Sequence, residues 1–267
     1  MASKIGEFLR ARRELVLPED VGISVTTRRR VSGLRRDELA LLAGISTEYY
    51  TRLEQGRDQH PSPQVLDALA RALRLEEDAT AHLHALAAPK PRPRRAERVR
   101  PSLVQLLAAW TETPAYVQGR HMDILAANAL ATAISPVFQP GRNLVHAAFL
   151  DAEFAALVDD HEAGVKRLVA ALRANAGPDV EDPRLIELVG ELSVRSDSFR
   201  RVWVRHDVRP LVGGGVHHML HPQVGPLTLS FDKLRVAEAE DQTLVVYHAE
   251  PGSDSERALR LLGSVIA

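Results

Sequence analysis

The side chains best suited to binding chemistry lie early in the chain, where arginines and hydroxyl groups gather between residues 28 and 57. Guanidinium groups neutralise nucleic-acid phosphates and bond guanine bidentately, while hydroxyl groups reach phosphates or base edges. The cationic triplet at 28–30 suits an arm on the phosphates or in a minor groove, or else a solvated loop. The candidate DNA-contacting residues are Arg28, Arg29, Arg30, Arg35, Arg36, Ser46, Thr47, Glu48, Tyr49, Arg52 and Arg57.

Two short helices joined by a sharp turn would position these side chains. Ala40 is a small residue on the inner stripe of a first helix, where a second helix can cross closely. Gly44 stands where a left-handed residue must end that helix, and Ser46 is an N-cap candidate for the next. Tyr50 and Leu53 form the inner stripe of the second helix, so its polar residues face outward. These offsets predict a helix-turn-helix; the alternative is a helical hairpin with a solvated polar face.

Three further helices would complete a small helical domain. Apolar residues from Ile5 to Leu15 repeat on one helical face, and Pro18 ends that helix. Residues 62–73 and 76–87 are both amphipathic. We therefore predict an α-helical, five-helix domain at the front of the chain.

The segment Leu34–Gly56, continued by Arg57–Leu73, resembles the Cro/repressor-type (xenobiotic-response-element, XRE) helix-turn-helix transcription regulators. The resemblance covers nearly all of the first 88 residues. It implies that the second helix of the motif reads double-stranded DNA. It also implies that Glu54 pairs with Arg13 of the first helix. The loop that holds residues 28–30 is absent from minimal repressors of this type.

Charge and proline content divide the chain in two. The 267 residues hold 34 Lys and Arg against 35 Asp and Glu, a net charge of −1. Residues 1–100 carry a net charge of +5 and the remainder −6, so the first part should bind DNA and the second should be repelled by it. Three prolines and four cationic side chains within residues 88–95 are typical of an extended linker. We predict a DNA-binding domain over 1–88, a linker over 89–101 and a second domain over 102–267.

The second domain mixes helices and strands. Residues 119–121 separate two short strand-like stretches, a pattern that predicts a hairpin, and Asn128 is an N-cap candidate for the helix after it. This order favours an α+β fold with an antiparallel sheet over a doubly wound sheet. We expect further helices over residues 151–175, 182–194, 198–206 and 255–264, and strands over 216–220, 227–231 and 244–249.

Four motifs in this domain resemble the PAS-like ligand-binding domain of the MmyB-like transcription regulators: Gly119–Asn128, Gly190–Ser196, Trp203–Val208 and Gln242–Tyr247. The resemblance implies a pocket for a small apolar molecule such as a fatty acid. The alternative is that the aromatic residues at these spacings are core. The candidate ligand-binding residues are Trp110, Tyr116, Met122, Ile124, Phe138, Phe149, Trp203, Leu229, Phe231 and Tyr247, with Asn128, Arg205 and His206 as polar anchors.

Composition and motifs argue against several other classes of protein. The chain has no cysteine, which removes disulfides, thiol nucleophiles and thiolate zinc sites. Its start lacks a signal peptide and no stretch is long and apolar enough for a membrane span, so we expect a cytoplasmic protein. The glycines at 213–215 lack the context of a phosphate loop, and His217 and His221 have no carboxylate at a useful offset for a metal site. We expect no enzyme activity, metal or cofactor.

The sequence thus predicts a one-component transcription regulator that binds operator DNA as a dimer and senses a ligand in its second domain. Two alternatives remain open for that domain. It could be a DNA-tethered enzyme, such as a hydrolase with His206 and Asp207, or a protein-interaction module without a pocket.

Overall fold

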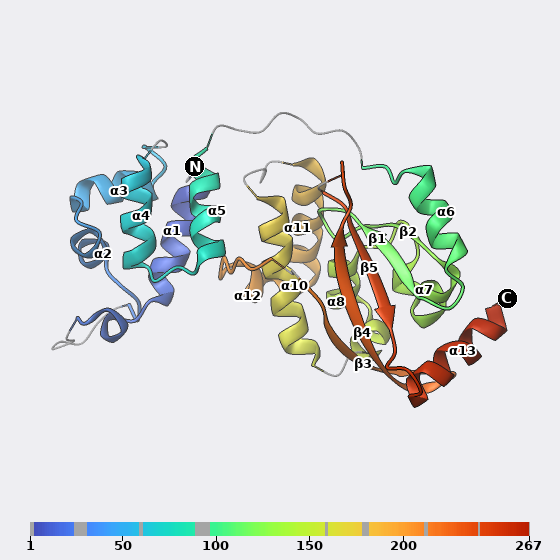
Figure 1. Ribbon diagram of the computed structural model, residues 1–267. Helices are drawn as coiled ribbons and strands as arrows, with labels where there is room; N and C mark the ends of the chain where they lie inside the picture. Colours follow the sequence, from blue (N-terminus) through green and yellow to red (C-terminus); the bar gives the residue numbers. More distant parts are fainter. Residues whose placement is uncertain are drawn as a thin grey trace.

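A computed structural model describes residues 3–23, 31–58, 61–88, 97–157, 160–177, 182–210, 213–239 and 241–266. The chain folds into a helical head, residues 3–88, and an α+β body, residues 97–266, which lie side by side (Figure 1). The two parts agree with the predicted fold class. Within the described ranges, no helix combines the length and the apolar character needed to cross a lipid bilayer.

The described part of the head contains five α-helices and one short 3₁₀-helix. Serine side chains cap three of them: Ser3, Ser46 and Ser62 accept hydrogen bonds from the first-turn amides of α1, α3 and α4. The elements are α1 (Lys4–Leu15), η1 (Pro18–Val21), α2 (Arg36–Leu42), α3 (Thr47–Glu54), α4 (Pro63–Ala72) and α5 (Glu77–Ala87).

The core of the head holds α2 and α3 in the crossing that the sequence predicts. Ala40, Tyr50 and Leu53 are buried in it. Gly44 has a φ of +67°, a left-handed conformation that lets the chain turn sharply between α2 and α3. A Cβ atom on Gly6 would lie 2.3 Å from the Glu54 carbonyl oxygen, so only glycine lets α1 approach the end of α3 this closely.

The body is built on a five-stranded antiparallel sheet with the strand order β2-β1-β5-β4-β3. Its strands are β1 (Ala115–Gln118), β2 (Ile124–Ala127), β3 (Gly215–His221), β4 (Gly225–Arg235) and β5 (Thr243–His248). Its helices are α6 (Pro101–Ala109), α7 (Ala129–Ile134), η2 (Pro136–Phe138), α8 (Leu144–Leu150), α9 (Ala152–Leu157), α10 (His161–Ala176), α11 (Pro183–Arg195), α12 (Asp197–Trp203) and α13 (Asp254–Ile266).

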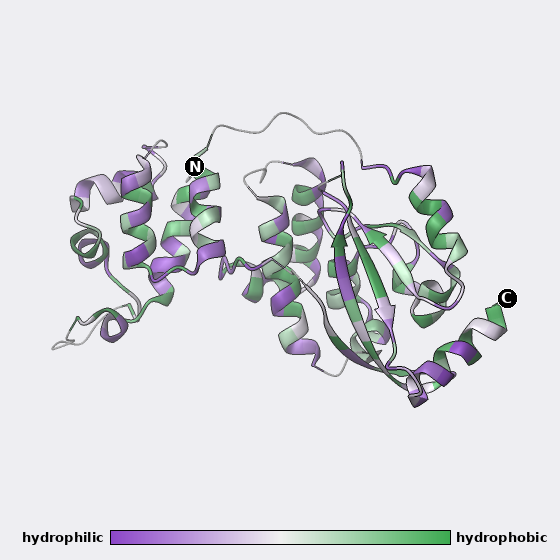
Figure 2. Ribbon diagram, viewed as in Figure 1, coloured by the Kyte–Doolittle hydropathy of each residue, from purple (hydrophilic) through white to green (hydrophobic). Residues whose placement is uncertain are grey.

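Successive side chains of each strand point to opposite faces of the sheet, and both faces carry apolar residues. Tyr116 and Val245, which are paired, belong to the main core against α7, α8 and α10–α12. Their neighbours Val117 and Leu244 point to the opposite face, where α6 covers them. Helices α10, α11 and α12 lie between the sheet and the head (Figure 1). Hydrophobic and hydrophilic residues alternate along these helices (Figure 2), as expected of helices that bury one face and expose the other.

Two of the expected helices have different bounds in the structure, and one helix was not expected. The single helix expected over 151–175 is two, α9 and α10, because Asp160 has non-helical dihedral angles and caps α10 by accepting from the Ala163 amide. Helix α8 was not foreseen. Helix α12 ends at Trp203 rather than at residue 206, because the chain turns toward the head and His206 has a φ of +52°.

Candidate DNA-binding surface and ligand cavity

Helix α3 presents an exposed polar face beside a buried apolar one. Thr47, Glu48 and Arg52 are exposed, whereas Tyr50 and Leu53 are fully buried. Ser46 accepts a hydrogen bond from the Tyr49 amide at 3.1 Å and so fixes where the helix begins. This is the geometry of a helix whose first turns can enter a major groove.

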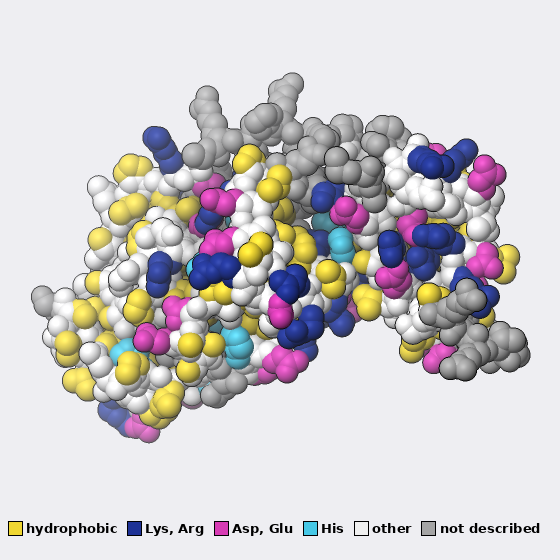
Figure 3. Space-filling model, turned by 180° about the vertical axis from the view of Figure 1, so that it is seen from behind, with side chains coloured by type: hydrophobic (Ala, Val, Ile, Leu, Met, Phe, Trp, Pro, Cys, Tyr) yellow, Lys and Arg dark blue, Asp and Glu magenta, His cyan; other side chains and the backbone are white. Residues whose placement is uncertain are grey.

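The other predicted DNA contacts lie in different settings. Arg35 and Arg57 are exposed at the start of α2 and just after α3. Tyr49 is half-buried, and the Arg52 guanidinium lies over its ring at 5.9 Å. Arg28, Arg29 and Arg30 lie outside the described residues. On the face shown in Figure 3, cationic side chains of the head are interspersed with acidic ones.

A buried ion-pair cluster fixes α3 against α1 and α2. Glu54 accepts hydrogen bonds from Arg13 Nε at 3.0 Å and Nη2 at 3.2 Å, which confirms the pairing implied by the resemblance. Arg36 of α2 donates to the same carboxylate at 2.7 Å, so this predicted DNA contact also holds the motif together. Burial opposes ionisation, but the two guanidinium groups outweigh it and keep the pKa of Glu54 below its usual value.

The body contains a cavity of 410 Å³ between the inner face of the sheet and helices α8 to α10. Aromatic rings form one wall: Tyr116 stacks on Phe138 at 4.7 Å between centroids, and Tyr247 lies 5.9 Å from Phe138. A concave, mostly apolar space with few polar groups is typical of a small-molecule site. Lining side chains with polar atoms are Gln118, Asp160, His161, Arg167, His217, His218 and Lys233, together with Tyr116 and Tyr247.

The structure brings some of the predicted ligand residues to this cavity and not others. The five that line it are Tyr116, Met122, Phe138, Phe231 and Tyr247. Ile124, Phe149 and Leu229 pack in the same core without lining the cavity, and Trp110 lies on the opposite face of the sheet. Asn128 caps α7 by accepting from the Ala131 amide, as expected of an N-cap. The remaining three, Trp203, Arg205 and His206, lie where the body meets the head.

Two cationic residues of the cavity were missed by the sequence reasoning. Lys233 follows Leu229 and Phe231 at the period of two that governs a strand, so it faces the same side as they do. That alternation could have identified it. Arg167 lies on α10, and no signal in the sequence marked it as a lining residue.

The segment that joins α12 to β3 contacts the head, and we call residues 204–209 the junction segment. Asp207 accepts a hydrogen bond from Arg12 Nη1 of α1 at 2.7 Å. The His206 ring meets the edge of Phe8 at 6.1 Å. Val208 is buried among the core residues of the head. A segment of the body thus completes the core of the head.

Arg173 on α10 holds the junction segment in place. Its guanidinium stacks on the Trp203 ring at 3.8 Å, donates to the Trp203 carbonyl at 2.6 Å and lies 3.1 Å from His206 Nδ1. No described carboxylate lies within ion-pair distance of it. Burial lowers the pKa of Arg173 to about 10, although the nearby charge of Asp207 partly offsets this effect.

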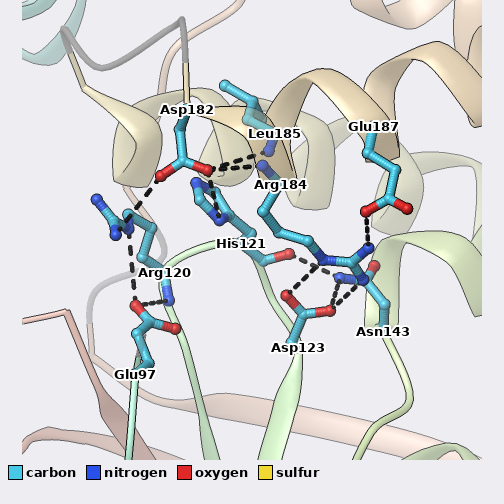
Figure 4. A network of polar contacts seen from close by, with 9 residues as sticks. All are labelled: Glu97, Arg120, His121, Asp123, Asn143, Asp182, Arg184, Leu185 and Glu187. Carbon is cyan, nitrogen blue, oxygen red and sulfur yellow. Dashed lines mark hydrogen bonds and ion pairs between the residues drawn. The ribbon is translucent and has the colours of Figure 1, made fainter. Parts of the chain in front are cut away.

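A second polar network ties the start of the body to the β1–β2 turn (Figure 4). Glu97 accepts from the Arg120 amide at 3.1 Å, and the Arg120 side chain bridges toward Asp182 at 3.7 Å. Arg184, at the start of α11, donates to Asp123 at 2.6 Å. The chain is therefore held to the body from residue 97 onward, which lies within the range 89–101 predicted as a linker.

Comparisons with known proteins agree with this division. Residues 4–83 match a family described as a helix-turn-helix domain, and residues 99–262 match the MmyB-like transcription regulator ligand binding domain. No curated protein matches the chain. The two matches support a DNA-binding transcription regulator. Because the second match spans more than half of the chain, the protein belongs to the family of the MmyB-like transcription regulator ligand binding domain.

Proposed function

We propose that this protein is a one-component, XRE-type transcription regulator in which a small apolar ligand, such as a fatty acid, changes how the head meets operator DNA. Helix α3 enters the major groove, with Thr47, Glu48 and Arg52 facing the bases and phosphates. Two heads of a homodimer meet half-sites roughly 34 Å apart, so a small change in head position weakens binding.

One observation carries the link between ligand and DNA: helix α10 lines the cavity and also holds the junction segment that contacts the head. Its first half lines the cavity with Gly164, Val165, Arg167 and Leu168. Its second half holds the junction segment through Arg173, and that segment contacts α1 through Asp207. A ligand that shifts α10 therefore acts on the head through packed contacts, provided that it binds the two arrangements with different affinity.

The alternatives raised by the sequence have less support. A hydrolase using His206 and Asp207 would need both side chains at a substrate. Instead, His206 faces Phe8 and Arg173, and Asp207 bonds Arg12 and Arg205. The cavity also favours a small-molecule ligand over an interaction module without a pocket.

The test is a binding titration on a DNA fragment selected by the intact protein from a random-sequence pool. Arg52→Ala should weaken binding by about 5- to 150-fold, because a good base contact is worth about 1–3 kcal/mol. Arg260→Ala, an exposed arginine on α13, is the matched control and should have no effect. Adding dodecanoic acid should change the wild-type affinity by about 5-fold or more.

Each part of the proposal can fail separately. Unchanged affinity in Arg52→Ala would contradict the docking of α3. Turnover of the added acid would favour the enzyme, whereas an affinity for DNA that no apolar ligand alters would favour the interaction module.

A further inference from the structure

Helix α11 carries an exposed apolar stripe on the side that faces away from the core. Its inner face packs in the main core of the body through three leucines: Leu185, Leu188 and Leu192. Ile186, Gly190 and Val194 follow at a spacing of four residues, which places them together on the opposite face. Ile186 and Val194 are 56% and 82% exposed. An apolar stripe along the outer face of a helix indicates a contact with another molecule.

The glycine in the middle of this stripe is not explained by packing among the described residues. Glycine in a helix interior is unfavourable relative to alanine, because it loses more backbone freedom on folding. A Cβ atom on Gly190 would meet no atom within 4 Å, and Gly190 does not have a positive φ. In contrast, the Gly6 position has no room for a Cβ atom. Gly190 instead leaves a gap on the outer face, where a second helix can approach closely.

The charges of α11 allow a second copy of the same helix to pack on this stripe. The stripe itself has no charged residue, and the charged residues of the helix pair with one another. Arg184 donates to Glu187 at 2.8 Å, and Arg195 donates to Glu191 at 2.6 Å. Two acids and two arginines give α11 no net charge, so two copies of it do not repel each other.

The position of α11 suits a dimer whose two heads bind one operator. The head lies beside α11 and not beyond either of its ends (Figure 1). A two-fold axis that crosses α11 at right angles near Gly190 can therefore run toward the head, and both heads then lie at the same end of the dimer. Val104 of α6 and Leu261 of α13 belong to another exposed apolar surface, which lies far from the head (Figure 1). A dimer through that surface would hold the two heads far apart.

We propose that α11 packs antiparallel against α11 of a second copy of the chain, with the two helices crossing at Gly190 and Ile186 of each copy against Val194 of the other. This inference rests on the proposed function and adds to it the surface that joins the two copies. One pair of helices buries less than the roughly 800 Å² per partner of a stable interface. We therefore expect a weak dimer in solution, which operator DNA strengthens by holding two heads on adjacent half-sites.

Cysteine cross-linking of the full chain tests the contact, because the natural sequence has no cysteine. Gly190→Cys should form a disulfide-linked dimer on mild oxidation, since the two-fold axis brings the two Cα atoms within the roughly 6 Å that a disulfide spans. A mixture of Ile186→Cys and Val194→Cys should cross-link more than either variant alone. Leu261→Cys, which is exposed on α13, is the matched control and should stay monomeric. A cross-link through Leu261→Cys and none through Gly190→Cys, with or without operator DNA, overturns the proposal.

Two further substitutions at Gly190 separate dimerisation from folding. Gly190→Glu places two like charges at the centre of the contact and should weaken dimerisation by about 100-fold or more in a sedimentation series. Gly190→Ala should raise the midpoint of thermal unfolding, because alanine favours a helix, and should weaken dimerisation, because it adds atoms where the helices meet. Leu261→Glu should leave dimerisation unchanged. A Gly190→Glu chain that dimerises like the wild type contradicts the contact.

The outcomes distinguish this inference from the proposed function. DNA binding with a ligand response in a chain that dimerises through another surface overturns only the α11 contact. A Gly190→Cys dimer that selects no DNA fragment supports the contact and contradicts the regulator.

Discussion

Two buried arginines, one in the head and one at the junction, are equally hidden from solvent but held in different ways. Arg13 and Arg173 are each 6% exposed. Arg13 shares Glu54 with Arg36. Burial opposes the charge of Arg13, but its own contact with Glu54 outweighs burial and raises its pKa. Arg173 has an aromatic ring, a carbonyl oxygen and a histidine nitrogen as its partners, and burial lowers its pKa.

This difference in contacts suggests that the head is held in one arrangement, whereas the junction can adjust. Removing one partner of a buried ion pair strongly destabilises a protein, because the other charge is left buried without its partner. Any movement that separates Arg13 or Arg36 from Glu54 carries a similar cost, so the cluster keeps α1, α2 and α3 in one arrangement. The contacts of Arg173 depend on shape and can be exchanged for similar ones after a small shift. We interpret the head as a rigid DNA-binding domain and the junction as the place where the position of the head relative to the body can change.

The largest effect is expected from removing the acid of the fixed cluster. Glu54→Gln leaves the buried Arg13 with only the half-exposed Glu14, at 3.8 Å, as an anion, and should lower the free energy of unfolding of the head by about 3–5 kcal/mol. Urea denaturation followed by circular dichroism measures this loss. Glu48→Gln, on the exposed face of the same helix, should change stability little. A loss below about 1 kcal/mol in Glu54→Gln would remove the basis for calling the head rigid.

The head could be predicted from sequence almost completely, because its signals are local. Gly44 and Ser46 fix the turn within a few residues, and the pairing of Arg13 with Glu54 followed from a family resemblance. The junction could not be predicted, since Arg12 and Asp207 are 195 residues apart and neither has a local signature of the contact.

The net charge of +5 over residues 1–100 is not spread evenly along them. Residues 1–88 hold 13 basic and 13 acidic side chains, so the excess of +5 lies in residues 89–100. We therefore expect attraction to DNA at the front of the chain to come from the linker sequence and from local groups on α3, not from the net charge of the head.

Acid should open the junction before it unfolds the head. Burial, with Arg173 and other cations, lowers the pKa of His206 to about 3, against an ordinary value of 6.5. The unfolded or open chain binds this proton below about pH 6.5 and the closed junction does not, so its stability falls as the pH drops, by about 2 kcal/mol at pH 5. In the head, burial lowers the pKa of His82 to about 4, so the head also loses part of its stability over this range. Glu54 has a lowered pKa, so the contribution of its cluster is present above its usual 4.5 and is lost only in stronger acid.

Tryptophan emission can follow this order of events. The chain has two tryptophans, Trp110 and Trp203, so a Trp110→Phe variant reports on the junction alone. Its emission should change between pH 6 and 5 while the helical circular dichroism stays constant. His206→Asn removes the titrating ring and should shift the change to lower pH. If emission and circular dichroism change together below pH 4.5, the junction is no weaker than the head.

The smallest effect on stability, and the sharpest on regulation, is expected from Arg173→Met. Methionine keeps apolar contact with the Trp203 ring and removes a buried charge that has no carboxylate partner among the described residues, so the loss should be about 1 kcal/mol, well below that of Glu54→Gln. The contacts that fix the Trp203 carbonyl and His206 are lost, however. DNA affinity without ligand should stay near that of the wild type, while the change in affinity caused by dodecanoic acid should disappear.

Lys166→Met, the same type of replacement at an exposed position of α10, is the control and should keep the response to dodecanoic acid. A full ligand response in Arg173→Met would mean that the signal reaches the head by a route other than the second half of α10.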